Sequence, residues 1–152
     1  MNQGVQTRTF TYNSLSRLTS ATNSESGTIN YVYDDNGNLT SKTDARGVVT
    51  DYVYDALNRV TNRNYSLTGS PPPNYQASPN VSYTYDDGTV ANSKGKLTKV
   101  SSSVSTTEYM AFDILGRVTR SKQTTDGVEY GGGTGSDKAA QRARLQLHKL
   151  ER

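Results

Sequence analysis

Short runs in which aromatic or β-branched residues alternate with polar ones recur along the chain, and each run ends at an Asp or Asn. Such alternation is typical of strands that bury one face. In the first three runs the last aromatic residues, Tyr12, Tyr33 and Tyr54, fall 21 residues apart. A fixed period predicts an internal repeat. We place five copies at Phe10–Asn13, Tyr31–Asp34, Tyr52–Asp55, Tyr83–Asp86 and Met110–Asp113.

Two longer spacings are explained by insertions. Tyr85 follows Tyr54 by 31 residues, and we predict an insertion loop at about residues 66–79, which contains all four prolines of the chain. Phe112 follows Tyr85 by 27 residues, because the stretch after Asp86 lengthens the next turn by six residues. Without these insertions the period of 21 residues holds throughout.

Each copy is expected to fold as a β-hairpin. In the clearest copy, Asp34 occupies the first position of a type I turn and Gly37 the fourth position. In a hairpin with a three-residue loop this fourth residue adopts the left-handed conformation, which favours Gly and then Asn. The corresponding residues are Ser16, Gly37, Asn58 and Gly116, of which Ser16 fits the rule least well.

The turns also predict a register across each hairpin. The residue before the turn Asp or Asn should face an aliphatic residue on the returning strand, which gives one aromatic–aliphatic pair in each hairpin. The predicted pairs are Tyr12 with Leu18, Tyr33 with Leu39, Tyr54 with Val60, Tyr85 with Leu97, and Phe112 with Val118. Tyr31 and Tyr52 lie two residues earlier and share the same face, because side chains alternate along a strand.

The tyrosine-rich face has two interpretations. The first is packing, in which the ring is buried and the hydroxyl stays hydrated or hydrogen-bonded. The second is an aromatic platform that binds sugars or nucleobases. We favour packing, because the tyrosines follow the period of the fold and not that of a separate site. The Asp or Asn after each tyrosine pair is interpreted as a turn residue.

Composition indicates a thin structure rather than a thick globular core. The 152 residues are 32% hydrophobic and include no tryptophan, yet the eleven tyrosines argue against disorder. Residues 1–130 carry 12 basic and 12 acidic residues, so the net charge of +3 arises from residues 131–152. The absence of cysteine excludes disulfides, and no apolar run reaches the roughly 18 residues of a membrane span. No signal peptide is predicted at the start of the sequence.

The sequence offers little for catalysis or metal binding. The one histidine, His148, lies outside the repeats, so a histidine-based triad among them is excluded. The segment Asp34–Asn38 resembles half of a calcium loop, but Ala45 stands where a bidentate Glu is needed. We therefore predict no enzymatic activity and no catalytic, metal or cofactor site.

The repeats resemble the YD repeats of RHS-repeat proteins. The best matches are YVYDDNGNLT (31–40), YVYDALNRVT (52–61) and FDILGRVT (112–119), and the resemblance covers about residues 5–130. The signature residues that carry it are Tyr12, Asn13, Leu18, Tyr31, Tyr33, Asp34, Gly37, Leu39, Tyr52, Tyr54, Asp55, Asn58, Val60, Tyr83, Tyr85, Asp86, Leu97, Phe112, Asp113, Gly116 and Val118.

The resemblance implies an all-β strip of about five tandem antiparallel hairpins, curved into part of a hollow shell. Proteins of this family include bacterial polymorphic toxins, the B/C components of insecticidal toxin complexes and the teneurins, and in the toxins the shell encloses a toxic domain. It therefore implies a structural fragment of a secreted or cell-surface protein. The implied partners are further RHS repeats or an enclosed toxin domain. The alternative is a carbohydrate-binding module with a glycan as partner, and nucleic acid is not an expected partner.

The last segment, residues 131–152, differs from the repeats at 1–130. A glycine-rich joint at Gly131–Gly135 is expected to lead into a basic helix or a disordered tail ending at Arg152. Three readings stay open: a non-native extension, a helix that docks on the hairpins, and a basic arm for anionic surfaces. The outer edges of such a sheet are unpaired, so self-association is expected as well.

Overall fold

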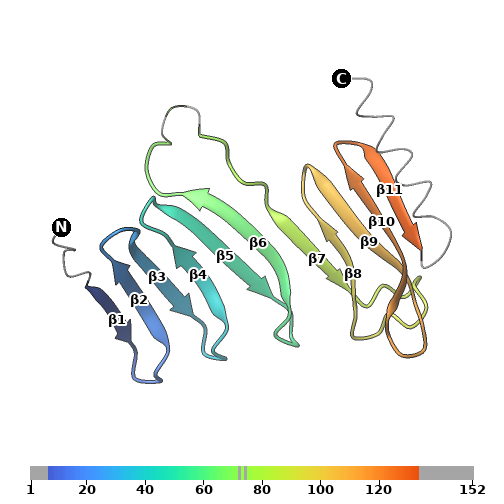
Figure 1. Ribbon diagram of the computed structural model, residues 1–152. Helices are drawn as coiled ribbons and strands as arrows, with labels where there is room; N and C mark the ends of the chain where they lie inside the picture. The colour runs from blue at the N-terminus through green and yellow to red at the C-terminus, as the bar shows by residue number, and fades with distance from the viewer. Residues whose placement is uncertain (1–6, 72, 74, 134–152) are drawn as a thin grey trace, which may run out of the picture. The chain divides into compact units, whose positions relative to one another are not determined.

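The computed structural model describes residues 7–71, 73 and 75–133, and over these residues the chain is built from β-strands and turns without a helix. The all-β prediction is confirmed. Contacts divide the chain into two compact units, Met1–Asn80 and Val81–Arg152, which are described separately (Figure 1). In this part of the chain no helix is long and apolar enough to cross a membrane.

The first unit contains three consecutive hairpins. Its strands are β1 (Arg8–Tyr12), β2 (Leu18–Asn23), β3 (Gly27–Tyr33), β4 (Leu39–Thr43), β5 (Val48–Tyr54) and β6 (Val60–Leu67). Each strand pairs antiparallel with the next one in sequence. The result is an open meander in which neighbours in sequence are neighbours in space (Figure 1).

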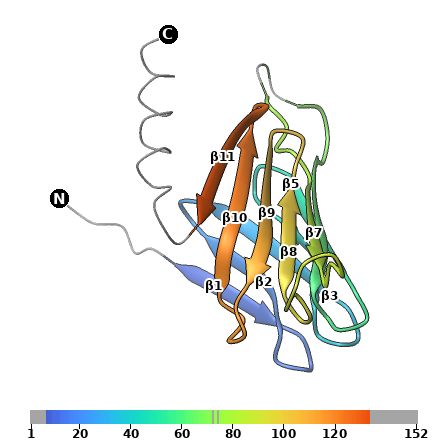
Figure 2. The same ribbon diagram turned by 90° about the vertical axis from the view of Figure 1, so that its right-hand side faces the viewer.

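The second unit continues the same pattern. It contains β7 (Val81–Tyr85), β8 (Leu97–Ser101), β9 (Ser105–Phe112), β10 (Val118–Thr125) and β11 (Val128–Gly133). Again each strand is antiparallel to its sequence neighbour, and Figure 2 shows β8 to β11 side by side. Within each unit the sheet is open. The predicted curvature of the whole strip stays a prediction.

Burial is slight, as expected for a single-layered sheet. Among the described residues, those classed as buried are Phe112, Ser93 and Thr98, all in the second unit. Most strand residues are half-buried, including the signature tyrosines of β3, β5 and β7. The residues between those tyrosines are exposed, for example Val32 and Val53. The two faces of the sheet therefore differ, with the tyrosine face the more protected.

Two predicted boundaries differ from the structure. Strand β6 extends to Leu67, so the insertion starts later than residue 66, because Val48 and Val49 supply pairing partners for the last two residues of β6. Gly131–Gly133 form the end of β11, where a flexible joint was expected, because they pair with residues 120–122 of β10. The helix or tail predicted after them lies outside the described residues.

The hairpin of β10 and β11 was not anticipated. Its two-residue turn is Asp126–Gly127, and both residues have positive φ, at 48° and 79°. An Asp-Gly turn of this kind matches the twist of two antiparallel strands. The Asp-Gly dipeptide was a sequence signal for this turn, but β11 itself does not contain a complete copy of the tyrosine signature.

Candidate functional site: the repeated hairpin turn

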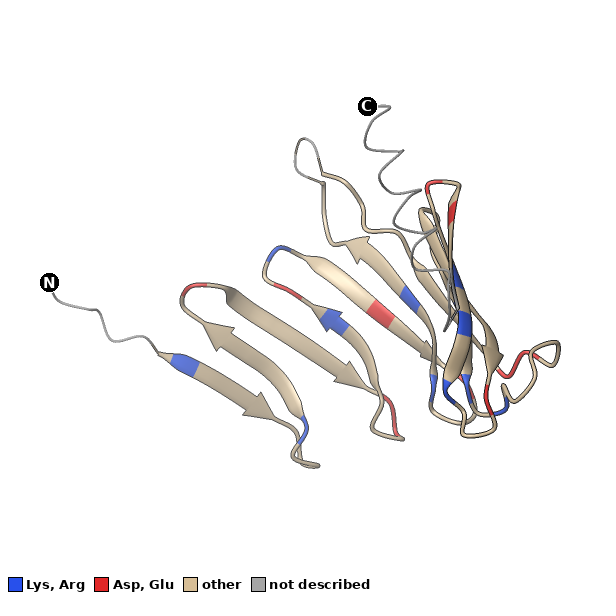
Figure 3. Ribbon diagram, turned by 45° about the vertical axis from the view of Figure 1, so that its right-hand side comes forward, with Lys and Arg blue, Asp and Glu red and all other residues tan. Residues whose placement is uncertain are grey.

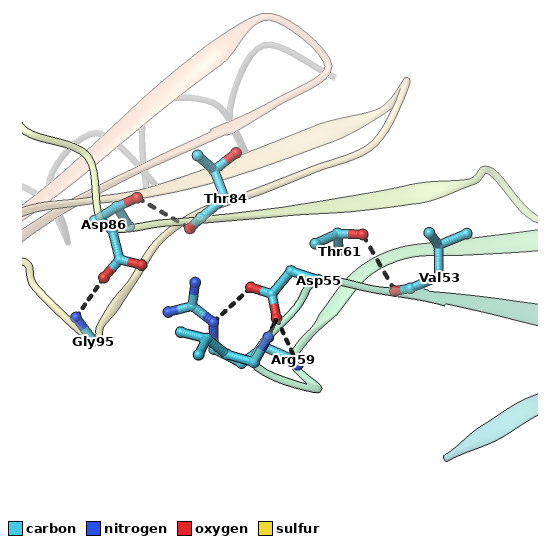
Figure 4. Close-up of polar contacts among 9 residues, drawn as sticks. Val53, Asp55, Arg59, Thr61, Thr84, Asp86 and Gly95 are labelled. Carbon is cyan, nitrogen blue, oxygen red and sulfur yellow. Dashed lines mark hydrogen bonds and ion pairs between the residues drawn. The ribbon is translucent and has the colours of Figure 1, made fainter. Parts of the chain in front are cut away.

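The turn between β5 and β6 is organised by the carboxylate of Asp55. One oxygen, Oδ1, accepts hydrogen bonds from the backbone N–H groups of Leu57 and Arg59, both at 2.9 Å. The other oxygen, Oδ2, accepts a hydrogen bond from Arg59 Nε at 2.7 Å (Figure 4). Three donors thus bind one carboxylate, and these hydrogen bonds fix the conformation of the loop between β5 and β6.

The same network recurs in the other hairpins with a three-residue loop. Asp113 accepts from the N–H groups of Leu115 and Arg117, both at 2.9 Å, and from Arg117 Nε at 2.6 Å. Asn13 accepts from the N–H groups of Leu15 and Arg17, both at 3.0 Å. An amide oxygen therefore replaces the carboxylate in the first copy.

The second copy pairs an acidic residue with an amide. Asp34 accepts from the N–H of Asn38 at 2.8 Å and from its side-chain amide at 3.0 Å. The position taken by Arg59 and Arg117 elsewhere is therefore filled by a neutral donor. The geometry of the turn is preserved although the ion pair is not.

The fourth turn residue is left-handed in all four of these copies. The φ angles are 59° at Ser16, 87° at Gly37, 58° at Asn58 and 76° at Gly116. Each donates its N–H to the carbonyl of the first turn residue at 2.9–3.1 Å. Ser16, the weakest candidate by residue type, adopts the same conformation as the glycines. The hydrogen bonds of the turn therefore outweigh the preference of serine for negative φ.

The register across the hairpins is the one that the turns predict. Strand pairing places Tyr12 opposite Leu18, Tyr33 opposite Leu39, Tyr54 opposite Val60, Tyr85 opposite Leu97, and Phe112 opposite Val118. The pairing then shifts by one residue next to each pair. One residue of the returning strand is left without an opposite partner, which is the mark of a β-bulge.

The bulged residue is a threonine in every copy: Thr19, Thr40, Thr61, Thr98 and Thr119. In four copies its hydroxyl donates to a backbone carbonyl of the first strand, as Thr61 does to Val53 at 3.2 Å (Figure 4). Our sequence reasoning missed this role. The signal is the recurring Leu-Thr or Val-Thr dipeptide, in which the first residue predicts the cross-strand pair and the threonine marks the bulge.

A further turn of this kind lies between β4 and β5, at the other end of the strands, and was also missed. Asp44 Oδ1 accepts from the N–H groups of Arg46 and Val48 at 2.9 and 3.0 Å, and Arg46 forms an ion pair with Oδ2 at 2.6 Å. Gly47, with φ of 79°, occupies the fourth position. Its carbonyl accepts from Thr68 N–H at 2.8 Å, which ties the start of the insertion to this turn.

The longest turn, between β7 and β8, follows a different scheme. Asp86 itself has a positive φ of 58°, and its Oδ1 accepts from the N–H of Gly95 (Figure 4). Ser93 donates its hydroxyl to the carbonyl of Asp87 at 2.7 Å, inside the turn. Asn92 reaches across to donate its side-chain amide to the carbonyl of Phe112 at 3.1 Å. Ser93 is one of the three buried residues among those described, so the inserted turn is itself packed against its unit.

Neighbouring hairpins of the first unit are joined by side-chain contacts. Arg17 Nη1 donates to the carbonyl of Asp34 at 2.8 Å, and its guanidinium lies 5.1 Å from the ring centroid of Tyr33. The hydroxyl of Tyr54 donates to the carbonyl of Leu39 at 2.8 Å. Such contacts couple each repeat to the next, which is how a hairpin too small to be stable alone is stabilised.

Figure 3 marks the acidic and basic residues along the chain, and four of them form a ladder across the second unit. Glu108 on β9 lies 3.4 Å from Lys99 on β8 and 3.9 Å from Lys122 on β10, measured between the charged atoms. Lys122 also contacts Glu129 on β11 at 2.6 Å. The hydrogen bond and charge of Glu129 raise the pKa of Lys122. Lys99 and Lys122 lie opposite Glu108, and Glu129 is a diagonal neighbour of Lys122, so alternating charges favour this strand order.

A shallow hollow of about 260 Å³ lies beside this ladder, lined by residues that include Asp87, Lys99, Glu108 and Arg120. The charges that line it are mixed in sign. Among the described residues, no group of three or more His, Cys, Asp or Glu side chains could hold a metal ion. His148 lies outside the described residues.

The turn carboxylates have lowered pKa values. The main cause is the hydrogen bond from the backbone N–H of Arg59 for Asp55 and of Arg117 for Asp113. For the remaining three, side-chain hydrogen bonds contribute most: Asn38 lowers the pKa of Asp34, Arg46 that of Asp44, and Thr89 that of Asp87. In each case the charged form is favoured because donors converge on it.

These shifts predict a loss of stability in acid. A carboxylate with a lowered pKa in the folded state stabilises the fold above its unfolded pKa of about 3.9, and this contribution disappears as the pH falls through the lower folded value. We expect the urea midpoint of unfolding to fall steadily between about pH 5 and pH 2. A chain with Asp55→Asn and Asp113→Asn keeps the acceptor, as Asn13 does, and should show a shallower decline. An unchanged slope would contradict the assignment.

The hairpins, their turns and their register define a protein built from tandem antiparallel β-hairpins. Residues 33–69 match the family model described as RHS Repeat, which confirms the predicted resemblance. No curated protein matches the sequence significantly.

Solved structures extend the fold similarity over 89% of the chain. A Photorhabdus luminescens Tc holotoxin pore with a mutation in TccC3 matches with a TM-score of 0.65 and 14% identity. A crystal structure of TcdB2-TccC3-Cdc42 matches with a TM-score of 0.64 and 12% identity. The chain spans only 6% and 7% of these two proteins. The family and the fold support a structural RHS module, and the carbohydrate-binding alternative has no support from these comparisons.

Proposed function

We propose that the chain forms part of the wall of an RHS shell that encloses a toxin domain in a secreted or cell-surface protein. The observation that carries this proposal is the repeated hairpin itself: the same turn network, bulge and cross-strand pair recur in both units. The likeness to Tc toxin structures supports it. The partners would be further RHS repeats and the enclosed domain.

The physical properties of the sheet suit a wall. Within each unit every strand pairs with its neighbours in sequence, so each unit supplies an unbroken stretch of sheet to such a wall. Contacts between hairpins, such as Arg17 with Asp34, let one repeat be added to another without a separate core. The signature residues are then structural, with the tyrosines as packing anchors and Asp or Asn as turn residues. No catalytic step is required of them.

A graft into a shell of known structure tests the proposal. Residues 8–133 would replace the matching hairpins of the TcdB2-TccC3 shell, and limited proteolysis would measure the protection of the enclosed domain. We expect the graft to protect the cargo nearly as well as the parent. A Gly/Ser segment of the same length provides the control for an open wall. If the grafted segment is itself resistant to protease but the cargo is as sensitive as in the control, the chain is not a wall element.

A further inference from the structure

Strand β1 is the most exposed strand of the first unit. All five of its residues are exposed, including the two aromatic rings of Phe10 and Tyr12, at 53% and 58%. Among the described strands of this unit it pairs with β2 alone, so it is an edge strand of the sheet (Figure 1). A strand with one free edge and apolar side chains is a template for pairing with another strand.

The hydrogen bonds show which residues of β1 face outward. The carbonyl of Thr11 accepts from the hydroxyl of Thr19 on β2, and Asn13 donates its N–H to the carbonyl of Arg17. The backbone groups of Thr11 and Asn13 therefore point toward β2. Because these groups alternate along an antiparallel strand, those of Arg8, Phe10 and Tyr12 point away from it. Three N–H groups and three carbonyls line the outer edge.

We propose that this edge binds β1 of a second copy of the chain, antiparallel and centred on Phe10. In this register Phe10 faces Phe10 of the other copy, Arg8 faces Tyr12, and Thr9 faces Thr11. Every outward N–H then finds an outward carbonyl, so the six backbone bonds extend the β1–β2 ladder across a two-fold axis. A shift by one residue would bring outward groups opposite inward ones and lose these bonds.

The side chains agree with the same register. Arg8, Phe10 and Tyr12 share one face of β1, since side chains alternate. The two Phe10 rings would meet at the centre, and each Arg8 guanidinium would lie beside a Tyr12 ring rather than beside the other Arg8. The threonines would meet on the opposite face, where Thr–Thr pairs are favourable. Strand β11 is a poorer candidate, because it ends in glycines that weaken a strand.

Sedimentation velocity of the full chain tests this pairing. The interface is small, so we expect a monomer–dimer equilibrium with a Kd between about 10 µM and 1 mM. Phe10→Pro removes an outward N–H but no bond to β2, and should weaken the dimer at least about tenfold while the melting temperature changes little. Phe10→Tyr keeps both the ring and the N–H, and should dimerise normally. A chain that stays monomeric over this range overturns the proposal.

Cysteine crosslinking tests the register without relying on the proline variant. The chain contains no cysteine, so single Thr9→Cys and Thr11→Cys variants carry one thiol each. In the proposed register Thr9 and Thr11 form non-hydrogen-bonded pairs. The Cα atoms of such pairs lie about 4.5 Å apart, within the range of a disulfide. An oxidised mixture of the two variants should form disulfide dimers at least about tenfold faster than a mixture with the exposed Val53→Cys variant. Equal rates overturn the proposal.

Discussion

Replacing Gly47 by alanine should lower the free energy of unfolding by about 2–4 kcal/mol, because strain and a steric clash act together. Gly47 has a φ of +79°, where a Cβ is disfavoured. A Cβ there would lie 2.5 Å from Thr68 Oγ1 and 3.1 Å from the Thr68 carbonyl oxygen. Thr68 must move, and it would lose both hydrogen bonds that it donates to the Gly47 carbonyl.

Gly37→Ala is the matched control for this prediction. Gly37 occupies the same turn position with a φ of +87°, but a Cβ added to it would meet no atom within 4 Å. This variant should cost only the backbone strain, about 1–2 kcal/mol. Urea denaturation followed by far-UV circular dichroism measures both. Equal losses for the two glycines would mean that the contact between the β4–β5 turn and Thr68 does not stabilise the fold.

These two glycines show how much of the fold the sequence could predict. Asp34 and Gly37 stand three residues apart in a strong turn pattern, and local backbone rules are enough to predict their turn and the pairing of Tyr33 with Leu39. The same rule applies to Ser16, which stands three residues after Asn13. Its φ of 59° follows from this position despite its residue type. Features that depend on a few consecutive residues were therefore predictable.

Features that depend on distant residues were not. The clash partner of Gly47 is Thr68, which is 21 residues away and lies just past the end of β6. The recurring Val-Thr dipeptide marks Thr61, but it does not show that the Thr61 hydroxyl reaches Val53 across the hairpin. Both belong to the packing of the ladder, and a spacing rule contains no information about it.

Burial is the clearest case of information missing from the repeat. Tyr12 and Phe112 hold the same position in their copies and face Leu18 and Val118. Phe112 is nevertheless only 7% exposed, whereas Tyr12 is 58% exposed. The difference arises from neighbours, because Phe112 lies beside the inserted turn of residues 86–96, whose Asn92 binds its carbonyl. Tyr12 belongs to a strand with one partner.

The removal of the Phe112 ring should therefore have a far larger effect than the removal of the Tyr12 ring. Phe112→Ala deletes the one apolar side chain that is buried among the described residues, and we expect a loss of about 2–4 kcal/mol from burial and the cavity left behind. Tyr12→Ala removes a mostly exposed ring and should cost less than about 1 kcal/mol. Urea denaturation gives the two values.

Hydrogen exchange shows where the loss falls. In Phe112→Ala, amides of β8 to β10 should exchange faster, and so should those of the inserted turn, because Asn92 of that turn donates a hydrogen bond to the carbonyl of Phe112. Amides of β3 to β6 belong to the other unit and should keep their protection. If both substitutions cost the same, burial at this position is set by the repeat and not by the insertion. The inserted turn would then be only a longer connection, without a role in packing the second unit.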